Sequence, residues 1–244
     1  MEKLMIKAKK SLSQNFLKDK NISKKITNLA KLKNNTVLEI GPGHGFMTDN
    51  ILINKPKKLY IIEKDKYLVT FLKKKYSDNK KIVIIEGDIL KLNLNKFKDL
   101  IIISNLPYNI STKVILYLFT FNKNILEMVF MIQKEVAEKF DYNINNMNKY
   151  KFLTRIMTSY LRHFEVSPKV FFPQPKVKST VVKFEFKNKN VDINRANNFS
   201  DIIFKNVRKK IYKNLKINKT ENIILNKRVN ELTIDELLWI YNFI

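Results

Sequence analysis

The residues Asn105-Leu106-Pro107-Tyr108 combine hydrogen-bond acceptors and a flat ring in a way that suits chemistry on an aromatic amine. Such an amine is a poor nucleophile, because its lone pair is delocalised into the ring. The Asn105 side-chain oxygen and the Leu106 carbonyl can both accept from it, which pulls the nitrogen toward tetrahedral geometry. Pro107 fixes the backbone that carries these acceptors, and Tyr108 offers a face on which an extruded base can stack. An ordinary turn would explain Asn105 and Pro107, but it would not require Tyr108.

Glycine and acidic residues at three other places fit the binding of a cofactor that contains adenosine. Gly41 and Gly43 lie in a turn that holds three of the chain's four glycines, and glycine lets a backbone approach a ligand closely. Glu63, about twenty residues further on, can accept hydrogen bonds from both hydroxyls of a ribose, and Asp88 can accept from an adenine amino group. These positions fit a nicotinamide dinucleotide as well as S-adenosylmethionine. The motif at Asn105 favours S-adenosylmethionine, because a nicotinamide oxidoreductase would not need it.

Each of these motifs follows a short apolar run that is typical of a buried parallel strand. The runs cover residues 37–40, 59–62, 82–85, 100–103 and 128–132, and helical patterns separate them at 23–30, 47–53, 67–76 and 112–119. This alternation predicts a Rossmann-like α/β fold with a doubly wound, mostly parallel sheet. Residues 160–166 and 180–186 flank a proline-rich loop and predict an antiparallel hairpin at the sheet edge.

A second, smaller domain is expected after the hairpin. Residues 187–198 are polar and suggest a linker, and helical patterns follow at 199–215, 221–225 and 234–243. We therefore expect a cofactor-binding catalytic domain over residues 1–187 and a small helical RNA-binding domain over residues 188–244.

The charge of the chain indicates a polyanionic partner. Its 244 residues include 47 Lys and Arg against 22 Asp and Glu, a formal net charge of +25. Nucleic acid fits best, because each phosphate contact releases counterions and adds affinity. A lysine bias from an AT-rich genome contributes to the excess, but it does not require acidic residues to be so outnumbered.

Several other classes of site are excluded or disfavoured by composition. Without cysteine the chain can form neither disulfides nor thiolate metal sites. Its two histidines, His44 and His163, have no metal-ligand spacing, so no metal is expected. No apolar run approaches the length of a membrane span. In the basic segment 1–10, the apolar stretch is too short for the core of a signal peptide. We expect a cytoplasmic protein with no membrane partner.

Four segments together resemble motifs of the rRNA adenine N6,N6-dimethyltransferase family. The segment Asn-Leu-Pro-Tyr-Asn-Ile-Ser at 105–111 resembles the family signature, and the segments at 13–17, 131–137 and 172–179 resemble three other family motifs. The similarity runs from about Lys9 to the C-terminus. The resemblance implies a Rossmann-like methyltransferase that uses S-adenosylmethionine. By the same resemblance, positions that contact this cofactor correspond to Asn15, Leu17, Gly41, Glu63, Asp88 and Asn105. Phe171 matches an aromatic residue that faces Tyr108 across the target base, although a hydrophobic plug is the alternative for it.

The small-subunit branch of this family fits the sequence best. That branch dimethylates two adjacent adenosines near the 3′ end of small-subunit rRNA, and the resemblance implies a monomer that acts on a partly assembled subunit. Leu106 favours it, because the large-subunit, macrolide-resistance branch tends to have Ile there. The basic run Arg208-Lys209-Lys210, in a helix expected over 204–215, also resembles the small-subunit branch and would face rRNA phosphates.

Two alternatives and a few departures remain at this point. The large-subunit enzyme is one alternative, and an assembly factor that has lost turnover is the other. Leu12 and Ser13 replace the Phe-Gly that usually precedes the first motif, and Lys151 stands where the family tends to have Gly. None of these departures touches the predicted chemistry.

Overall fold

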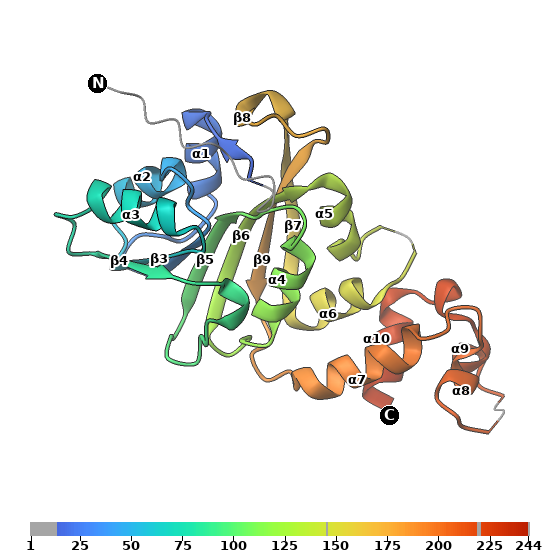
Figure 1. Cartoon of the computed structure of the whole chain (residues 1–244). Coiled ribbons are helices and arrows are strands. Elements are labelled where there is room, and N and C mark those ends of the chain that lie inside the picture. The colour runs from blue at the N-terminus through green and yellow to red at the C-terminus, as the bar shows by residue number, and fades with distance from the viewer. Residues whose placement is uncertain (1–13, 145, 219–220, 244) are drawn as a thin grey trace.

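The computed structural model describes residues 14–144, 146–218 and 221–243, and its centre is a β-sheet (Figure 1). Within these residues the sheet has seven strands in the order β4-β3-β2-β5-β6-β9-β7. The strands are β2 Thr36–Ile40, β3 Lys58–Glu63, β4 Ile82–Glu86, β5 Leu100–Asn105, β6 Ile125–Gln133, β7 Thr158–Val166 and β9 Ser179–Phe186. Strands β2 to β6 run parallel, whereas β9 is antiparallel to both of its neighbours. The predicted α/β sheet with an antiparallel edge hairpin is therefore confirmed.

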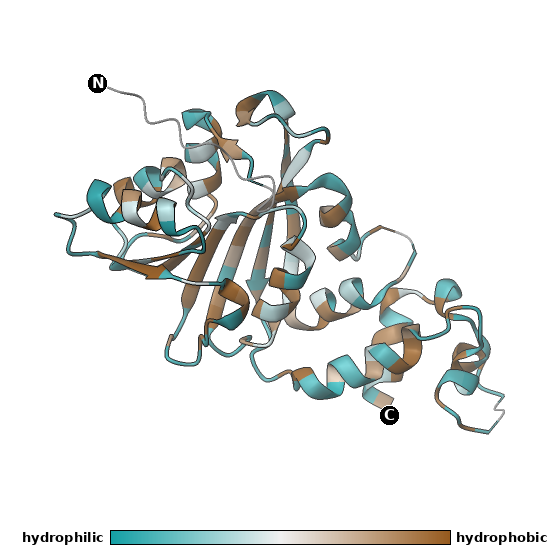
Figure 2. Cartoon of the chain, viewed as in Figure 1, coloured by the Kyte–Doolittle hydropathy of each residue, from teal (hydrophilic) through white to brown (hydrophobic). Residues whose placement is uncertain are grey.

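Alternate residues of the central strands enter two separate cores, one on each face of the sheet. In β2, Val37 belongs to one core and Leu38 to the other, and Ile101 and Ile102 of β5 divide in the same way. All four side chains are fully buried. The central strands therefore carry apolar residues on both faces, and much of their length is brown, that is hydrophobic, in Figure 2. This is why the sequence contains continuous apolar runs and not an alternation of apolar and polar residues.

Helices cover both faces of the sheet, as the doubly wound pattern predicts. On the face with the Val37 core lie α1 Lys20–Thr27, α2 Phe46–Ile53 and α3 Lys66–Lys75, and on the other lie α4 Ser111–Phe119, α5 Lys134–Phe140 and α6 Lys149–Met157. Asp19, Asp65 and Asn148 start α1, α3 and α6 by accepting hydrogen bonds from backbone N–H groups of the first turn. The sequence patterns did not predict α5 and α6.

A small two-stranded sheet lies apart from the large one. It consists of β1 Phe16–Leu17 and β8 Phe171–Phe172, which pair antiparallel. Phe16 lies opposite Phe172, and Leu17 lies opposite Phe171. The pairing joins the segment before α1 to the proline-rich loop, two parts of the chain that are far apart in sequence. No pattern predicts it, because two-residue strands have no periodicity to detect.

The helices after β9 are α7 Ile193–Phe204, α8 Ile211–Asn214, α9 Ile223–Asn226 and α10 Ile234–Phe243. The single helix that we expected over residues 199–215 is wrong, because turns over residues 205–208, a bend at Lys209 and a β-bridge of Lys210 with Arg228 separate α7 from α8. The Asn214 side chain closes this connection by donating two 3.1 Å hydrogen bonds to carbonyl groups at the end of α7 and in the turns. Helical periodicity alone cannot reveal such a break.

The break changes the setting of the basic run. Arg208, Lys209 and Lys210 lie in the exposed connection between α7 and α8 and not on a helix. The linker expected over 187–198 is also too long, because Asp192 accepts from two backbone N–H groups and starts α7 directly after it. Only the first half of that polar stretch is non-helical.

Aromatic packing connects these last helices to the body of the molecule. Rings of Phe152 on α6, Phe199 on α7 and Tyr241 on α10 lie with centroids 5.0 to 5.3 Å apart. The predicted domain boundary after residue 187 falls next to the end of β9, and it stays a prediction. No helix among the described residues is long and apolar enough to cross a membrane. Segment 1–10 and the departures at Leu12 and Ser13 lie outside the described residues.

Candidate active site

A cavity of about 470 Å³ opens at the carboxyl ends of β2, β3, β4 and β5. Its lining includes every position that we expected to contact a cofactor: Asn15, Leu17, Gly41, Gly43, Glu63, Asp88 and Asn105. It also includes Leu106, Pro107 and Tyr108. Residues from separate parts of the sequence are therefore brought to one place, while the role of each stays a prediction. No cluster of three or more metal-binding side chains occurs within the described residues.

The turn after β2 depends on glycine for two different reasons. Gly41 and Gly43 both have positive φ angles, 63° and 58°, in the left-handed region that other residues rarely adopt. A Cβ atom at Gly43 would lie 2.7 Å from the Phe16 ring, so the N-terminal segment can cross the turn only over a glycine. A Cβ at Gly41 would meet nothing within 4 Å. The Gly41 backbone therefore borders open space, where a ligand can approach it.

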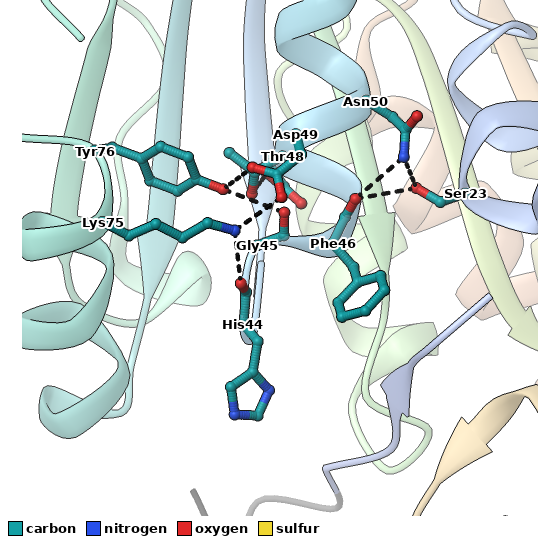
Figure 3. Close-up of polar contacts among 10 residues, drawn as sticks. Ser23, His44, Gly45, Phe46, Thr48, Asp49, Asn50, Lys75 and Tyr76 are labelled. Atoms are coloured by element: carbon teal, nitrogen blue, oxygen red, sulfur yellow. Dashed lines mark hydrogen bonds and ion pairs between the residues drawn. The ribbon is translucent and has the colours of Figure 1, made fainter. Parts of the chain in front are cut away.

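Side chains from α3 support this turn from behind (Figure 3). The Lys75 ammonium donates to the His44 carbonyl at 3.2 Å and to Asp49 at 2.8 Å. The Tyr76 hydroxyl lies 2.6 Å from an Asp49 oxygen and 3.2 Å from the Gly45 carbonyl. Sequence reasoning missed this support, because nothing in the sequence shows that the end of α3 faces the glycine turn.

The start of α2 is tied to α1 in the same region (Figure 3). Ser23 donates to the Phe46 carbonyl at 3.3 Å, and the Asn50 amide donates to both the Ser23 hydroxyl and the Phe46 carbonyl. The turn is thus held on both sides, which fixes its backbone beside the cavity.

Glu39 is a buried carboxyl at the end of β2 that also lines the cavity. Its Oε2 accepts a 2.6 Å hydrogen bond from the Thr48 hydroxyl, whereas Oε1 has no hydrogen-bond partner among the described residues. Complete burial raises the pKa of Glu39 to about 8, against the opposing effect of the Thr48 bond. Glu39 is therefore protonated in the folded protein at neutral pH. It was part of the predicted glycine motif, but no role was predicted for it.

Glu63 is held at the end of β3 by backbone donors. Its Oε1 accepts from the N–H groups of Lys64 at 2.8 Å and Asp65 at 2.9 Å. Burial raises the pKa of Glu63, although these donors and the Gly43 N–H favour the charged form. With one oxygen fixed by the backbone, the carboxyl has a set orientation on the cavity wall.

Asp88 is oriented by two partners at the end of β4. Its Oδ1 accepts from the Leu90 N–H at 3.0 Å, and its Oδ2 lies 3.0 Å from the Lys64 ammonium. Burial acts to raise the pKa of Asp88, but the Leu90 N–H and Lys64 outweigh it and hold that pKa below its usual range. The pairing with Lys64 was not predicted from the sequence.

Asn105 ends β5 with its amide already oriented. Its Nδ2 donates to the Asn15 carbonyl at 2.9 Å, so its Oδ1 is the atom that can accept from a ligand. The next residue, Leu106, continues the ladder by donating to the Met131 carbonyl at 3.1 Å. The bond to Asn15 also ties the N-terminal segment to β5. This arrangement agrees with an acceptor role for Asn105.

Tyr108 is fixed to the antiparallel part of the sheet. Its hydroxyl lies 2.6 Å from the Ser179 hydroxyl on β9. Burial raises the pKa of Tyr108, so the phenol is neutral. Ser179 belongs to the predicted proline-rich motif, but we had assigned it no role. The bond fixes one end of the Tyr108 side chain, which lines the cavity.

Phe171 lies in a hydrophobic core, as its alternative as a hydrophobic plug implies, and its role opposite Tyr108 stays a prediction. Phe171 is only 4% exposed and packs in a core with Leu17 and Val181. Its neighbour Phe172 is 43% exposed and lines the cavity. Successive side chains of a strand point to opposite sides, which is why one residue of this pair is buried and the other exposed. The resemblance could not reveal which one is buried.

Comparison with known proteins identifies relatives over nearly the whole chain. The ribosomal RNA adenine dimethylase family matches residues 5–244. Ribosomal RNA small subunit methyltransferase A of Mycoplasma mobile is 40% identical over 212 residues, which cover 85% of this chain and 83% of the relative. The protein of the same name from Hydrogenobaculum sp. is 38% identical over 245 residues, covering 98% and 94%.

Two solved structures resemble the whole architecture. A dimethyladenosine transferase from Plasmodium falciparum is 26% identical with a TM-score of 0.76, and the alignment covers 93% of this chain and 98% of that one. The 23S rRNA methyltransferase ErmE has a TM-score of 0.78 and the same coverage, but it is only 19% identical and therefore shows a likeness of fold alone.

The buried carboxyl of Glu39 predicts a specific dependence of stability on pH. Between about pH 4.5 and 8 the folded state keeps the proton that the unfolded state releases, so the free energy of unfolding falls as pH rises. Glu39→Gln removes this effect. In urea unfolding experiments, we expect the free energy of unfolding of Glu39→Gln to rise relative to that of the wild type by up to about 1.4 kcal/mol for each unit of increasing pH. Glu86→Gln, at an exposed position, is the control, and a pH-independent difference for Glu39→Gln would contradict the burial argument.

Proposed function

The chain belongs to the ribosomal RNA adenine dimethylase family, and on this basis we propose that it transfers methyl groups to the N6 amines of two adjacent adenosines near the 3′ end of small-subunit rRNA. The observation that carries the proposal is Asn105, whose amide is held by the Asn15 carbonyl so that its oxygen is left for an amine donor. The curated relatives named for the small subunit support this branch of the family.

Membership in this family implies a methyl donor of the S-adenosylmethionine type. The residues of the cavity fit that molecule, which would supply an electrophilic methyl group when bound. Glu63 would accept from its ribose hydroxyls and Asp88 from its adenine amine. The backbone at Gly41 and Gly43 would border its chain, with Asn15 and Leu17 covering it. About 470 Å³ is within the range of cavities that hold small ligands.

The proposed catalysis rests on positioning. Asn105 and the Leu106 carbonyl accept from the adenine amine and direct its lone pair, while Tyr108 stacks on the base. A general base is not required, because the amine loses its proton readily once it carries a methyl group and a positive charge. The neutral, anchored phenol of Tyr108 fits a stacking role and not proton transfer.

The proposed RNA partner is a partly assembled small subunit that the protein binds as a monomer in the cytoplasm. The net charge of +25 would supply affinity for phosphates. Residues 188–244, with the exposed run Arg208-Lys209-Lys210, would form a helical RNA-binding domain beside the catalytic domain of residues 1–187.

Methyl transfer from a radiolabelled donor to unmethylated small-subunit particles tests the proposal. We expect label in N6,N6-dimethyladenosine at two adjacent positions near the rRNA 3′ end, and none in large-subunit particles. Label in large-subunit rRNA would identify the other branch, and no transfer with normal particle binding would identify an assembly factor.

The first prediction from this proposal concerns the cofactor. Glu63→Ala removes a buried acceptor, so the dissociation constant for S-adenosylmethionine should rise at least about five-fold, which corresponds to ~1 kcal/mol. Calorimetry measures it, and Glu86→Ala, an exposed carboxylate at the end of the neighbouring strand, should bind normally. Unchanged affinity of the Glu63 variant would remove the ribose assignment.

The second prediction concerns the chemical step. Asn105→Ala removes one acceptor and should lower the single-turnover rate by roughly 10²-fold or more at saturating cofactor. Tyr108→Phe keeps the stacking face and should retain most activity, whereas Tyr108→Ala should not. Full activity of either alanine variant would contradict the positioning mechanism, even with the family assignment intact.

The third prediction concerns the basic connection between α7 and α8. Replacing Arg208, Lys209 and Lys210 with Ala should weaken particle binding and reduce the salt slope by up to about three, while cofactor affinity stays the same. The matched control replaces Lys66, Lys73 and Lys74 on α3, at the other end of the molecule (Figure 1). Equal losses of particle affinity in both triple variants would mean that net charge alone matters. Unchanged affinity of the Arg208, Lys209 and Lys210 variant would mean that the RNA-binding surface lies elsewhere.

A further inference from the structure

An aromatic ring and an ammonium group form a pair at the rim of the cavity. Phe172 lines the cavity and is 43% exposed. The Lys18 Nζ lies 4.0 Å from the centroid of the Phe172 ring, a cation–π contact, and Lys18 lines the cavity as well. The positioning mechanism at Asn105 and Tyr108 uses neither residue. An exposed aromatic ring next to a cation is the combination that binds unpaired nucleotides.

The backbone holds this pair in place. Phe172 lies on β8 opposite Phe16 on β1, and the Lys18 N–H donates to the Val170 carbonyl at 2.9 Å. Below the pair, Phe171 is buried in the core. The Phe16 ring in turn packs on His44 of the glycine turn, with centroids 4.5 Å apart. The rim pair is therefore part of a fixed wall, and an incoming base would meet a ring that is already oriented.

The rim pair does not fit the target base itself. The target amine must reach Asn105 and Leu106, and Leu106 is only 1% exposed on the cavity wall. Phe172, in contrast, is 43% exposed, and Lys18 covers one face of its ring. One free face allows one base to stack from the solvent side. The base that meets this face belongs to a nucleotide that stays outside while its neighbour enters.

We propose that Phe172 and Lys18 form a subsite for the nucleotide that flanks the target adenosine. The Phe172 ring stacks on the flanking base, and the Lys18 ammonium meets the phosphate between that nucleotide and the target. The subsite rests on the proposed function and adds the recognition of a second nucleotide to it. Because stacking tolerates any base, the subsite accepts an adenosine before or after methylation. This suits a reaction that must bind the same pair of nucleotides more than once.

Substitutions separate the subsite from a structural role. Phe172→Leu should raise the KM for unmethylated small-subunit particles about ten-fold, with kcat nearly unchanged, and Phe172→Tyr should restore the KM. Lys18→Met should raise the KM by a smaller factor and reduce the salt slope by about one, whereas Lys18→Arg should not. The matched controls are Val177→Ala and Lys176→Met, exposed positions in the same loop that do not line the cavity.

Reconstituted particles with an abasic nucleotide on one side of the target provide the direct test. In the wild type, loss of the base on one of the two sides should raise the KM by about the factor that Phe172→Leu produces. The Phe172→Leu variant should be insensitive to the same loss, because the contact is already absent. Additive effects of the two changes would overturn the subsite.

Further outcomes distinguish a failure of the subsite from a failure of the proposed function. A wild-type KM for Phe172→Leu, with Tyr108→Ala inactive, would remove the subsite and leave the proposed function standing. Weaker S-adenosylmethionine binding by Phe172→Leu in calorimetry would mean that the ring only keeps β1 over the cofactor cavity, which also overturns the subsite. If the wild type methylates no small-subunit particle, the proposed function fails first.

Discussion

The parallel pairing of β2 with β3 on one side and with β5 on the other determines where the active site lies. The order of the strands switches direction between β2 and β5. The connection after β2 leads to β3 on one side, and the connection after β5 leads to β6 on the other side, so a crevice opens between the two connections. The glycine turn and Asn105 stand on either side of this crevice. Glu63 and Asp88 follow on the next strands in the same direction. One pattern of backbone hydrogen bonds thus brings together the residues for which we propose cofactor contacts.

A sheet can arrange one wall of a cavity, but the opposite wall has to come from elsewhere in the chain. Here it comes from the segment before α1, which several contacts hold in place. Asn15 accepts from the Asn105 amide, and β1 pairs with β8. The first contact joins the segment to Asn105 and the second joins it to the proline-rich loop. The N-terminal segment therefore connects the end of β5 with the proline-rich loop.

The parts that could be predicted are those that local sequence determines. Apolar runs and scarce glycines revealed the sheet, its edge hairpin and the cavity positions from Gly41 to Asn105. The features that could not be predicted depend on contacts between segments that are distant in sequence. Lys75 and Tyr76 support the glycine turn only because α3 ends beside it, and Lys64 reaches Asp88 only because β3 and β4 are neighbours. The burial of Phe171 and the exposure of Phe172 could not be predicted either, because the pairing of β8 with β1 decides which of the two adjacent side chains is buried.

The distribution of charge explains how one molecule can bind partners of opposite sign. The chain is strongly basic overall, yet the cavity contains the carboxyl groups of Glu63 and Asp88, besides the buried carboxyl of Glu39 that keeps its proton. A sulfonium cofactor is a cation and needs negative charge near it, whereas rRNA needs positive charge. Lys64 and Lys18 stand where the two regions meet. The Leu90 N–H and Lys64 hold the pKa of Asp88 below its usual range and fix its carboxylate, and Lys18 lies over the Phe172 ring at the rim. The electric field of the carboxyl groups in the cavity is screened within a Debye length. These groups can therefore coexist with a basic exterior that attracts phosphates.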